Sequence, residues 1–441
     1  MKNGFGRAEA YKKTKDEEQR TKNKEQRTKD KGQRTKDERR NFFFVKMNDC
    51  MFLLIFNPSN DMALAADAQM YVPPRNVRQM EKDLELFPLA WAEDEDAVLR
   101  EEDGLGNEGK RDSIDFSQYV PKPWGWSKSL KNRLLRLGVL EENMPSDEQL
   151  DWWRRWSSRE FAAKYIQRFL GSVELMNGNR TCDVFVGEDM RFCQNVSDLR
   201  FQKGQRMILK SPWSSSGRGV FVAENMNEKT LTRIEGVLRN QGGILVDRYY
   251  HKVLDFALEF DAQASGKVEF LGYSVFQAAE DGKYGWNKVA RQEELEQDLL
   301  NICGKDAMEW LTSTISLHQK LLEEEFRGRY VGPVGIDMLV VHEEGKQIKI
   351  HPCIEINLRM NMGIVAIHLA DKLEQLRKMV EEGMSYEDCR KHQRFRFLDF
   401  LPEEDFKSFI LSSTRLPLSP MREHGFQASV EGGKLVITFC S

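Results

Sequence analysis

The stretch 351–363, HPCIEINLRMNMG, alternates polar and apolar residues in the pattern of a β-strand with two unlike faces. Glu355, Asn357 and Arg359 lie two residues apart, so on a strand their side chains project from one face. The residues between them, which fall on the opposite face, are apolar: Ile354, Ile356 and Leu358. A strand that buries one face and presents an acid, an amide and a guanidinium on the other suits a metal–phosphate site.

A second stretch, GPVGIDMLVV (332–341), repeats this arrangement, with apolar residues at alternate positions: Ile336, Met338 and Val340. Pairing of the two strands brings Asp337 beside Glu355 and Asn357. Carboxylate and amide oxygens are ligands that Mg²⁺ prefers, so we predict a magnesium site at these three residues. From the two strands alone, an ordinary strand pair with a structural ion pair explains the pattern equally well.

An upstream segment, MILKSPWSSSGRGVFV (207–222), predicts a strand that ends at Lys210, a loop of small residues, and a second strand. Small side chains let backbone N–H groups approach an anion, and Lys210 and Arg218 supply positive charge. The small residues of the loop are Ser214, Ser215, Ser216, Gly217 and Gly219. The motif also fits an ordinary hairpin with a solvated lysine.

A third segment, GILVDRYYHKVLDFALEFD (243–261), predicts two strands joined by a short aromatic link. Such a link offers backbone hydrogen bonds to the edge of an adenine, and Asp255 on the second strand is placed to reach a ribose.

The order of these segments resembles the ATP-grasp superfamily over about residues 150–380. The resemblance implies an ATP-grasp domain at 151–385, with antiparallel sheets in a small subdomain (about 200–250) and a large one (about 251–385). A nucleotide would lie between the two subdomains.

The resemblance also implies roles for single residues. Lys210 would bind the α- and β-phosphates, and the 214–219 loop would fold over the phosphates as a lid. The backbone near Asp247, Tyr249 and Tyr250 would hold adenine. Arg359 would contact the transferred phosphate. The implied cofactors are ATP and one or two Mg²⁺, which Mn²⁺ can replace, with the metal ligands Asp337, Glu355 and Asn357.

The sequence departs from the usual pattern of the superfamily in three places. Asp247 stands where the adenine segment usually carries Glu, and the loop is rich in Ser rather than Gly. The earlier nucleotide-binding lysine has no clear match; Arg159 and Lys164 are the candidates.

The activity that the resemblance implies is that of an ATP-dependent carboxylate–amine ligase. A substrate carboxylate would attack the γ-phosphate to give an acylphosphate and ADP, and an amine or similar nucleophile would displace phosphate. Small molecules or peptides are the expected substrates. Two alternatives stay open at this point: a kinase of the same superfamily, and a nucleotide-binding regulatory module without turnover. The sequence leaves the identity of the acid and the amine open, and also the oligomeric state.

The 441 residues are enough for two or three domains. We expect an α/β domain at 47–150, opening with the strand MFLLIF (51–56) and helping to bind the substrate. In the loop NPSNDMALAADA that follows, Asn57, Asn60 and Asp61 either touch a substrate or form the turn and cap the helix, and we favour the second interpretation.

Coarser patterns predict the remaining elements. A helix over about 150–170 should bridge the domains with its tryptophans in the core, and an α+β extension at 386–441 should contain a strand pair over 425–439. Further helices are expected at about 227–241, 293–301, 306–326 and 364–381. The fold class is therefore mixed: an α/β domain followed by a two-subdomain α+β domain.

Composition agrees with a cytoplasmic protein that has no membrane partner. Hydrophobic residues make up 40% of the chain and charged ones 31%, and no apolar run approaches the ~20 residues of a membrane helix. The seven cysteines are scattered and odd in number, which favours free thiols in a reducing compartment. The segment GLGNEGK (104–110) follows an acidic stretch, and we interpret it as a solvated loop rather than a nucleotide site.

The first 46 residues form a basic arm with a net charge of +8, which leaves −12 on the rest of the chain. A seven-residue repeat in this arm (EQRTKNK, EQRTKDK, GQRTKDE) has no apolar positions, so we expect it to be disordered. It is either a tail for nucleic acid or an acidic partner, or a dispensable start-site artefact, which we favour. We therefore do not expect nucleic acid as a partner.

Overall fold

A computed structural model describes the chain from Met51 onward, with gaps. The described residues are 51–104, 114–177, 184–200, 206–214, 219–278, 284–342, 347–400, 403, 406, 425–431 and 434–440. The chain divides into two compact units, Met1–Cys50 and Met51–Ser441, and every described residue belongs to the second. The predictions for the basic arm, and for all of GLGNEGK except its first residue, lie outside the described residues.

The described chain opens with a small parallel sheet. Its strands lie in the order β2-β1-β3, namely β2 (Ala97–Val98), β1 (Phe52–Ile55) and β3 (Val120–Pro123), and its helices are α2 (Asn60–Ala66), α3 (Arg75–Asp83) and α4 (Lys128–Arg136). Leu53 and Leu54 of β1 pack into two different hydrophobic clusters, so this strand is buried on both faces, as in α/β domains. The predicted α/β class of this region is confirmed.

The loop after β1 differs from the prediction in one detail. The N-cap of α2 is Ser59, and Asn60 and Asp61 are already helical residues, so neither of them caps the helix. Asn57 instead holds the 124–126 loop, since its amide donates to the carbonyl of Gly125 at 2.8 Å.

The predicted helix over 150–170 is two helices. These are α5 (Asp147–Trp156) and α6 (Arg159–Asn177), separated by Ser157 and Ser158. At the start of the second helix, the Ser158 hydroxyl accepts from the N–H of Glu160. The N–H of Arg159 donates to the carbonyl of Pro212 at 3.0 Å. The break therefore fixes the start of α6 beside the segment that follows β5. Trp152 and Trp153 are buried, as predicted.

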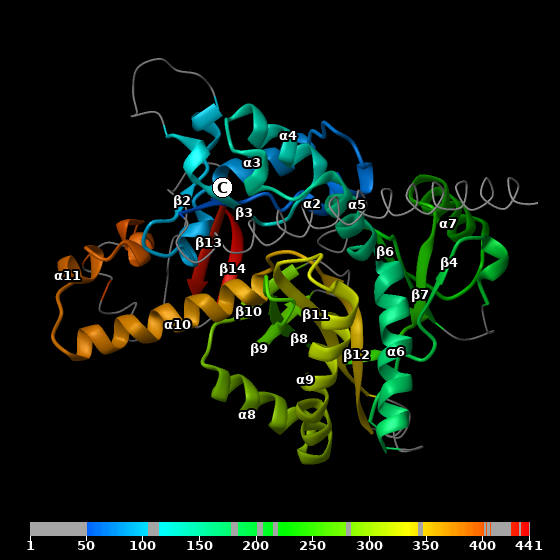
Figure 1. Cartoon of the computed structure of the whole chain (residues 1–441). Coiled ribbons are helices and arrows are strands. Elements are labelled where there is room, and N and C mark those ends of the chain that lie inside the picture. Colours follow the sequence, from blue (N-terminus) through cyan, green and yellow to red (C-terminus); the bar gives the residue numbers. More distant parts are fainter. Residues whose placement is uncertain are drawn as a thin grey trace, which may run out of the picture. The chain divides into compact units, whose positions relative to one another are not determined.

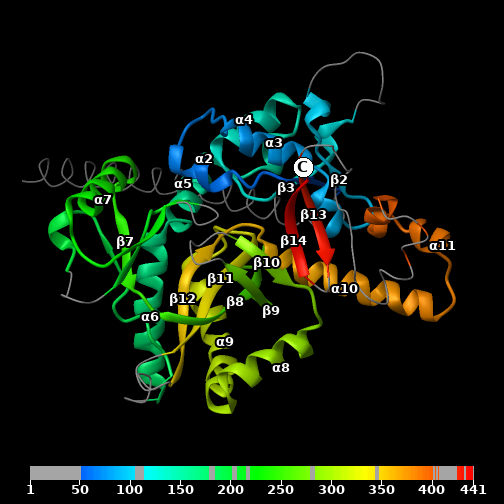
Figure 2. The same ribbon diagram turned by 180° about the vertical axis from the view of Figure 1, so that it is seen from behind.

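A four-stranded antiparallel sheet follows. Its order is β4 (Arg191–Cys193), β7 (Ile244–Arg248), β5 (Met207–Lys210) and β6 (Val220–Ala223), with α7 (Glu228–Gln241) packed against it. The two views place α6 between this sheet and β12 (Figures 1 and 2).

The larger sheet has seven antiparallel strands. Their order is β12 (Ile348–Asn357), β11 (Gly332–His342), β8 (His251–Ala262), β9 (Val268–Ala278), β10 (Tyr284–Lys288), β14 (Lys434–Cys440) and β13 (Gly425–Glu431). One face carries Phe256, Ile336 and Met338 into a core shared with α8 (Gln292–Cys303) and α9 (Lys305–Phe326). The opposite face is covered in part by α10 (Met362–Glu381).

The C-terminal strand pair was predicted, but its place was not. β14 pairs with β10, so the two last strands extend the large sheet (Figure 1). The remaining described elements are α11 (Tyr386–Arg390) and 3₁₀ turns at Phe87–Ala90, Glu101–Gly104, Phe116–Gln118, Glu141–Asn143, Val196–Asp198 and Gln393–Phe400. Within the described ranges, no helix combines the length and apolarity needed to cross a membrane.

Candidate active site

Asp337 and Glu355 face each other across the antiparallel strands β11 and β12. They are direct pairing partners, and Gly335 pairs with Asn357 two residues further along, on the same face. The Asn357 side chain lies close enough to Asp337 to lower the pKa of that acid. The prediction that strand pairing brings Asp337 beside Glu355 and Asn357 is therefore confirmed.

Lys210 approaches these acids from the other sheet. It is the last residue of β5, and its buried Nζ lies 3.5 Å from a backbone carbonyl oxygen of β12, that of the residue before Glu355. Burial and the neighbouring Arg159 lower the pKa of Lys210, while Asp247, Glu355 and Asp337 act in the opposite direction. The amine is thus placed where the two sheets meet, facing the carboxylates.

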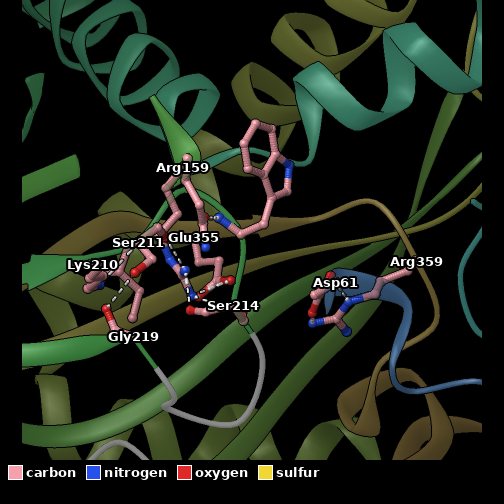
Figure 3. A network of polar contacts seen from close by, with 11 residues as sticks. Asp61, Arg159, Lys210, Ser211, Ser214, Gly219, Glu355 and Arg359 are labelled. Atoms are coloured by element: carbon pink, nitrogen blue, oxygen red, sulfur yellow. Dashed lines mark hydrogen bonds and ion pairs between the residues drawn. The ribbon is translucent and has the colours of Figure 1, made fainter. Parts of the chain in front are cut away.

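Arg159 is the second cation of the site, and it comes from the start of α6. Its Nη2 donates to both oxygens of Glu355 at 2.8 Å each, and its Nη1 donates to the Ser211 carbonyl at 2.6 Å and the Ser214 hydroxyl at 2.7 Å (Figure 3). Lys164, the other candidate for the missing cation, is 70% exposed and pairs within its own helix. The structure thus brings Arg159 into the site and leaves Lys164 out.

The two paired acids have opposite electrostatic surroundings. Burial alone would raise the pKa of Glu355, but the charges of Arg159 and Lys210 outweigh it and hold that pKa below its ordinary value. Burial and the nearby charges of Glu355 and Glu259 raise the pKa of Asp337 to about 8. One acid is therefore held as a carboxylate, while its neighbour keeps a proton near neutral pH.

Glu259 is a third buried acid, and it was not among the predicted site residues. It lies on β8, where the Ser274 hydroxyl and the Asn361 amide each donate to its carboxylate at 2.8 Å. Burial raises its pKa to about 7 against these hydrogen bonds. Two glycines make room for it, since a Cβ at Gly335 or Gly363 would lie 2.7 Å and 2.1 Å from its oxygens.

A signal for Glu259 was present in the sequence. In β8 the alternate residues Phe256, Leu258 and Phe260 are all fully buried in the core. The residues between them therefore share the face of Asp337, because β8 pairs directly with β11. The same alternation that identified Glu355 would have identified Glu259.

Arg359 lies just beyond the end of β12, before α10. Its guanidinium pairs with the carboxylate of Asp61 from α2, with Nε 3.2 Å from Oδ1 and Nη2 3.0 Å from Oδ2 (Figure 3). Burial would lower the pKa of Arg359, but the charge of Asp61 raises it above its ordinary value. The sequence favoured a capping role for Asp61 and did not predict its contact with Arg359.

The predicted adenine segment joins the two sheets directly. Asp247 lies on β7, and its Oδ2 is 3.0 Å from Nε2 of His351, which is fully buried on β12. Two atoms beside this contact are buried without a hydrogen-bond partner: the Tyr250 hydroxyl and Nδ1 of His351. The Tyr249 N–H donates to the carbonyl of Arg206. Adenine binding by this segment stays a prediction.

Asp255 already has partners in this structure. Its carboxylate pairs with Lys252 at 2.6 Å and accepts from the N–H of Ala278 at 3.1 Å. Both contacts use Oδ2 of Asp255, and the ribose role stays a prediction.

The Ser/Gly loop is closed at its base. The N–H of Ser211 donates to the carbonyl of Gly219 at 2.9 Å, and Gly219 has φ +89°, a conformation that favours glycine. Ser214 contacts Arg159, so both described ends of the loop border the site. Ser215, Ser216, Gly217 and Arg218 lie outside the described residues.

The predicted metal ligands fit a divalent cation by charge. Asp337, Glu355 and Glu259 crowd together closely enough to raise the pKa of Asp337, and a cation relieves such repulsion. Among the described residues, no group of three or more His, Cys, Asp and Glu side chains has the geometry of a metal site, and the predicted set has only two carboxylates plus the Asn357 amide. In this structure Arg159 supplies the positive charge to Glu355.

A cavity of about 10 Å³ lies between Asp61, Ser214, Glu355, Asn357 and Arg359. This is room for about one water molecule, so a nucleotide needs the surrounding side chains to move apart. A larger cavity of about 630 Å³ lies between β10, α8 and α10. We place the site at the small cavity because four of the charged residues that line the large one pair with each other, as Lys288–Asp298 and Arg291–Glu294.

No protein-family model and no curated protein sequence matches this chain. Solved structures that resemble it include biotin carboxylase from Campylobacter jejuni in a β,γ-ATP complex (15% identity, TM-score 0.39, 73% of this chain and 70% of that one). Another is N5-carboxyaminoimidazole synthetase from Staphylococcus aureus with ADP (12% identity, TM-score 0.40, 89% of this chain and 95% of that one). A third is L-amino acid ligase from Bacillus licheniformis (11% identity, TM-score 0.35, 73% of this chain and 71% of that one).

These solved structures are ATP-grasp enzymes, the superfamily that the sequence motifs resemble. At such identities and TM-scores the likeness carries no argument about what this chain binds or does. That argument rests on the geometry of the site.

Proposed function

We propose that this chain is an ATP-dependent ligase that joins a carboxylate to an amine, or a similar nucleophile, through an acylphosphate. ADP and phosphate are the other products. One observation carries the proposal: the adjacent acids Asp337 and Glu355 meet three cations, Lys210, Arg159 and Arg359, which converge from different elements where two antiparallel sheets meet. Opposed buried charges of this kind suit a metal-bound polyphosphate.

Each cation has a task in this reaction. Lys210 and Arg159 neutralise the polyphosphate, which requires Arg159 to leave Glu355. Arg359 grips oxygens of the transferred phosphate or of the acylphosphate, for which a planar guanidinium is better suited than an ammonium. No protein side chain needs to act as a nucleophile.

Asp337, Glu355 and Asn357 are the residues that would hold one or two Mg²⁺, or Mn²⁺ in its place. Bound there, the metal ion would neutralise charge that develops on the phosphate oxygens. The raised pKa of Asp337 supports this assignment, since a cation beside this acid would favour its ionised form.

The substrates are proposed to be small molecules or peptides, one with a carboxylate and one with an amine. The first domain contributes to their binding, since Asp61 on its helix α2 lines the small cavity together with Glu355 and Arg359. Nothing in the site distinguishes one acid from another.

The test incubates the protein with ATP, Mg²⁺, hydroxylamine and a panel of carboxylic acids. Hydroxylamine intercepts an acylphosphate as a hydroxamate whatever the natural amine is, so only the acid has to be found. ADP, free phosphate and hydroxamate in equal amounts, with no acylphosphate released into solution when hydroxylamine is left out, support a ligase. A stable phosphorylated product would indicate a kinase instead, and ATP binding without ADP formation for any acceptor would indicate a regulatory module.

A further inference from the structure

The ion pair between Asp61 and Arg359 joins the first domain to the candidate site. Asp61 belongs to α2, and Arg359 follows β12, 298 residues later. Both side chains are mostly buried, with 13% and 17% of their surface exposed. A buried carboxylate–guanidinium pair with two hydrogen bonds has a fixed geometry, so each residue determines where the other points.

The pair uses one edge of the guanidinium and leaves two N–H donors of Arg359 open. Nε and Nη2 of Arg359 donate to Asp61, and Nη1 donates to the carbonyl of Met360 at 3.2 Å. An arginine has five N–H donors, so two remain, one on each Nη nitrogen. In the described part of the chain no acceptor takes either of them. These two N–H groups are available to oxygens of a phosphate or carboxylate.

The surroundings of Asp61 fix it in this role. Asn57 and Asn60 flank the turn before Asp61, and both hold the 124–126 loop. Asn57 donates to the carbonyl of Gly125. Asn60, with its amide nitrogen turned toward the loop, donates to the carbonyl of Trp126 at 2.8 Å. A Cβ at Gly125 would lie 2.4 Å from the Asn60 side chain, which shows how closely the two segments approach. Of the polar residues in this turn, Asp61 alone reaches the site, and it lines the small cavity.

We propose that Asp61 is a positioning residue for Arg359. This role rests on the proposed function: Asp61 holds the Nε–Nη2 edge, so that the remaining N–H groups of Nη1 and Nη2 are directed at the γ-phosphate or the acylphosphate. Because Asp61 belongs to the first domain, the grip on the reacting phosphate also depends on how that domain sits on the site. A purely structural ion pair would tie the domains together without this effect.

A positioning role and a purely structural role for Asp61 predict different results in a binding measurement that needs no acid or amine substrate. Calorimetry in the presence of Mg²⁺ measures two affinities, one for ADP and one for an ATP analogue that has a β,γ-imido bridge. The ratio of the analogue's affinity to that of ADP reports the contact with the γ-phosphate. Arg359→Ala should lower the ratio about 10-fold or more, the size of one or more charge-assisted hydrogen bonds. Asp61→Asn should lower it similarly while the affinity for ADP stays unchanged. Asp61→Glu, which keeps the charge on a longer side chain, should give an intermediate ratio.

Asp94→Asn is a matched control. Asp94 is also a first-domain carboxylate whose partner, Arg394, lies 300 residues away, and it has no contact with the site residues. This variant should keep the wild-type ratio. Circular dichroism melting establishes that each variant is folded, and Asp61→Glu decides the question if Asp61→Asn does not fold.

The inference is overturned if Arg359→Ala lowers the ratio and the folded Asp61 variants do not. A lower melting temperature at an unchanged ratio would show that the pair is only structural. If the folded wild type binds neither nucleotide, the proposed function fails, and the role of Asp61 falls with it.

Discussion

The guanidinium of Arg159 donates to both oxygens of the Glu355 carboxylate, at 2.8 Å each. The acid predicted to bind a metal ion is therefore already paired with a cation, which comes from the start of α6. Both groups lie away from bulk water, with 5% and 25% of their side-chain surface exposed. Nucleotide binding under the proposed function then exchanges partners: Arg159 turns to the phosphates and Glu355 to the metal ion.

Replacing Arg159 by Ala should destabilise the nucleotide-free protein by about 3 kcal/mol, because the mostly buried Glu355 carboxylate loses the cation that donates to both of its oxygens. Addition of millimolar Mg²⁺ should restore part of this loss, since a cation can then reach the carboxylate. Chemical denaturation with and without MgCl₂ measures both effects.

The control is Lys164→Ala on the same helix, where an exposed pair contributes little. That variant should stay within about 0.5 kcal/mol of wild type and respond to Mg²⁺ as wild type does. An Arg159→Ala protein that is as stable as the control would show that Glu355 does not need the cation.

Glu355→Gln and Arg359→Ala should each lower turnover about 100-fold or more while the fold stays intact. Glutamine keeps the shape of the side chain but not its charge, and alanine removes the grip on the phosphate. ADP release measures turnover, and thermal melting checks the fold. A variant that melts at the wild-type temperature and retains its activity would contradict the assignment of that residue.

The buried acid Glu259 should make stability depend on pH. Its folded-state pKa of about 7 lies above the ordinary 4.5, so the folded protein holds a proton that the unfolded chain releases. This contribution to stability is fully present below about pH 4.5 and is lost as the pH rises through about 7.

Glu259→Gln removes this titration and keeps partners for Ser274 and Asn361. Between pH 5 and pH 8.5 the variant should gain about 2–3 kcal/mol in unfolding free energy relative to wild type. Loss of the Glu259 charge also lowers the pKa of Asp337, so the measured difference includes the coupling between the two acids. Urea denaturation at the two pH values is the measurement, and parallel pH profiles would show that Glu259 is ionised throughout.

Local patterns in the sequence were enough to predict part of the site. Alternation along two strands placed Asp337 opposite Glu355, and the register of β11 and β12 confirms it. Lys210 ends its strand as predicted, and the predicted helix 364–381 is α10, Met362–Glu381. Each of these predictions depends on residues close together in the chain, where periodicity carries the information.

The ion pairs of the site could not be predicted in this way. Arg159 and Glu355 lie 196 residues apart, and Asp61 and Arg359 lie 298 apart. Arg159 in particular depends on the break between α5 and α6, whereas the sequence pattern predicted one continuous helix. Two serines are a weak signal for a break, and it is the contact with Pro212 that holds the start of α6 in place.

Gly335 should not tolerate a side chain, although it lies in the middle of a strand. A Cβ there would lie 2.4 Å from the Asn361 amide nitrogen and 2.7 Å from an oxygen of Glu259. These two groups are buried and hydrogen-bonded to each other, and Asn361 also caps α10 by accepting from the N–H of Ile364. Gly335→Ala should therefore cost about 1–3 kcal/mol in unfolding free energy.

The matched substitution is Gly236→Ala in helix α7, where a Cβ would meet nothing within 4 Å. Alanine is the better helix former, so this variant should gain about 0.5–1 kcal/mol. Chemical denaturation of both variants gives the difference between the two sites. If Gly335→Ala were as stable as Gly236→Ala, the Glu259–Asn361 contact would have room to move, and Asn361 would not hold the start of α10 rigidly behind Arg359.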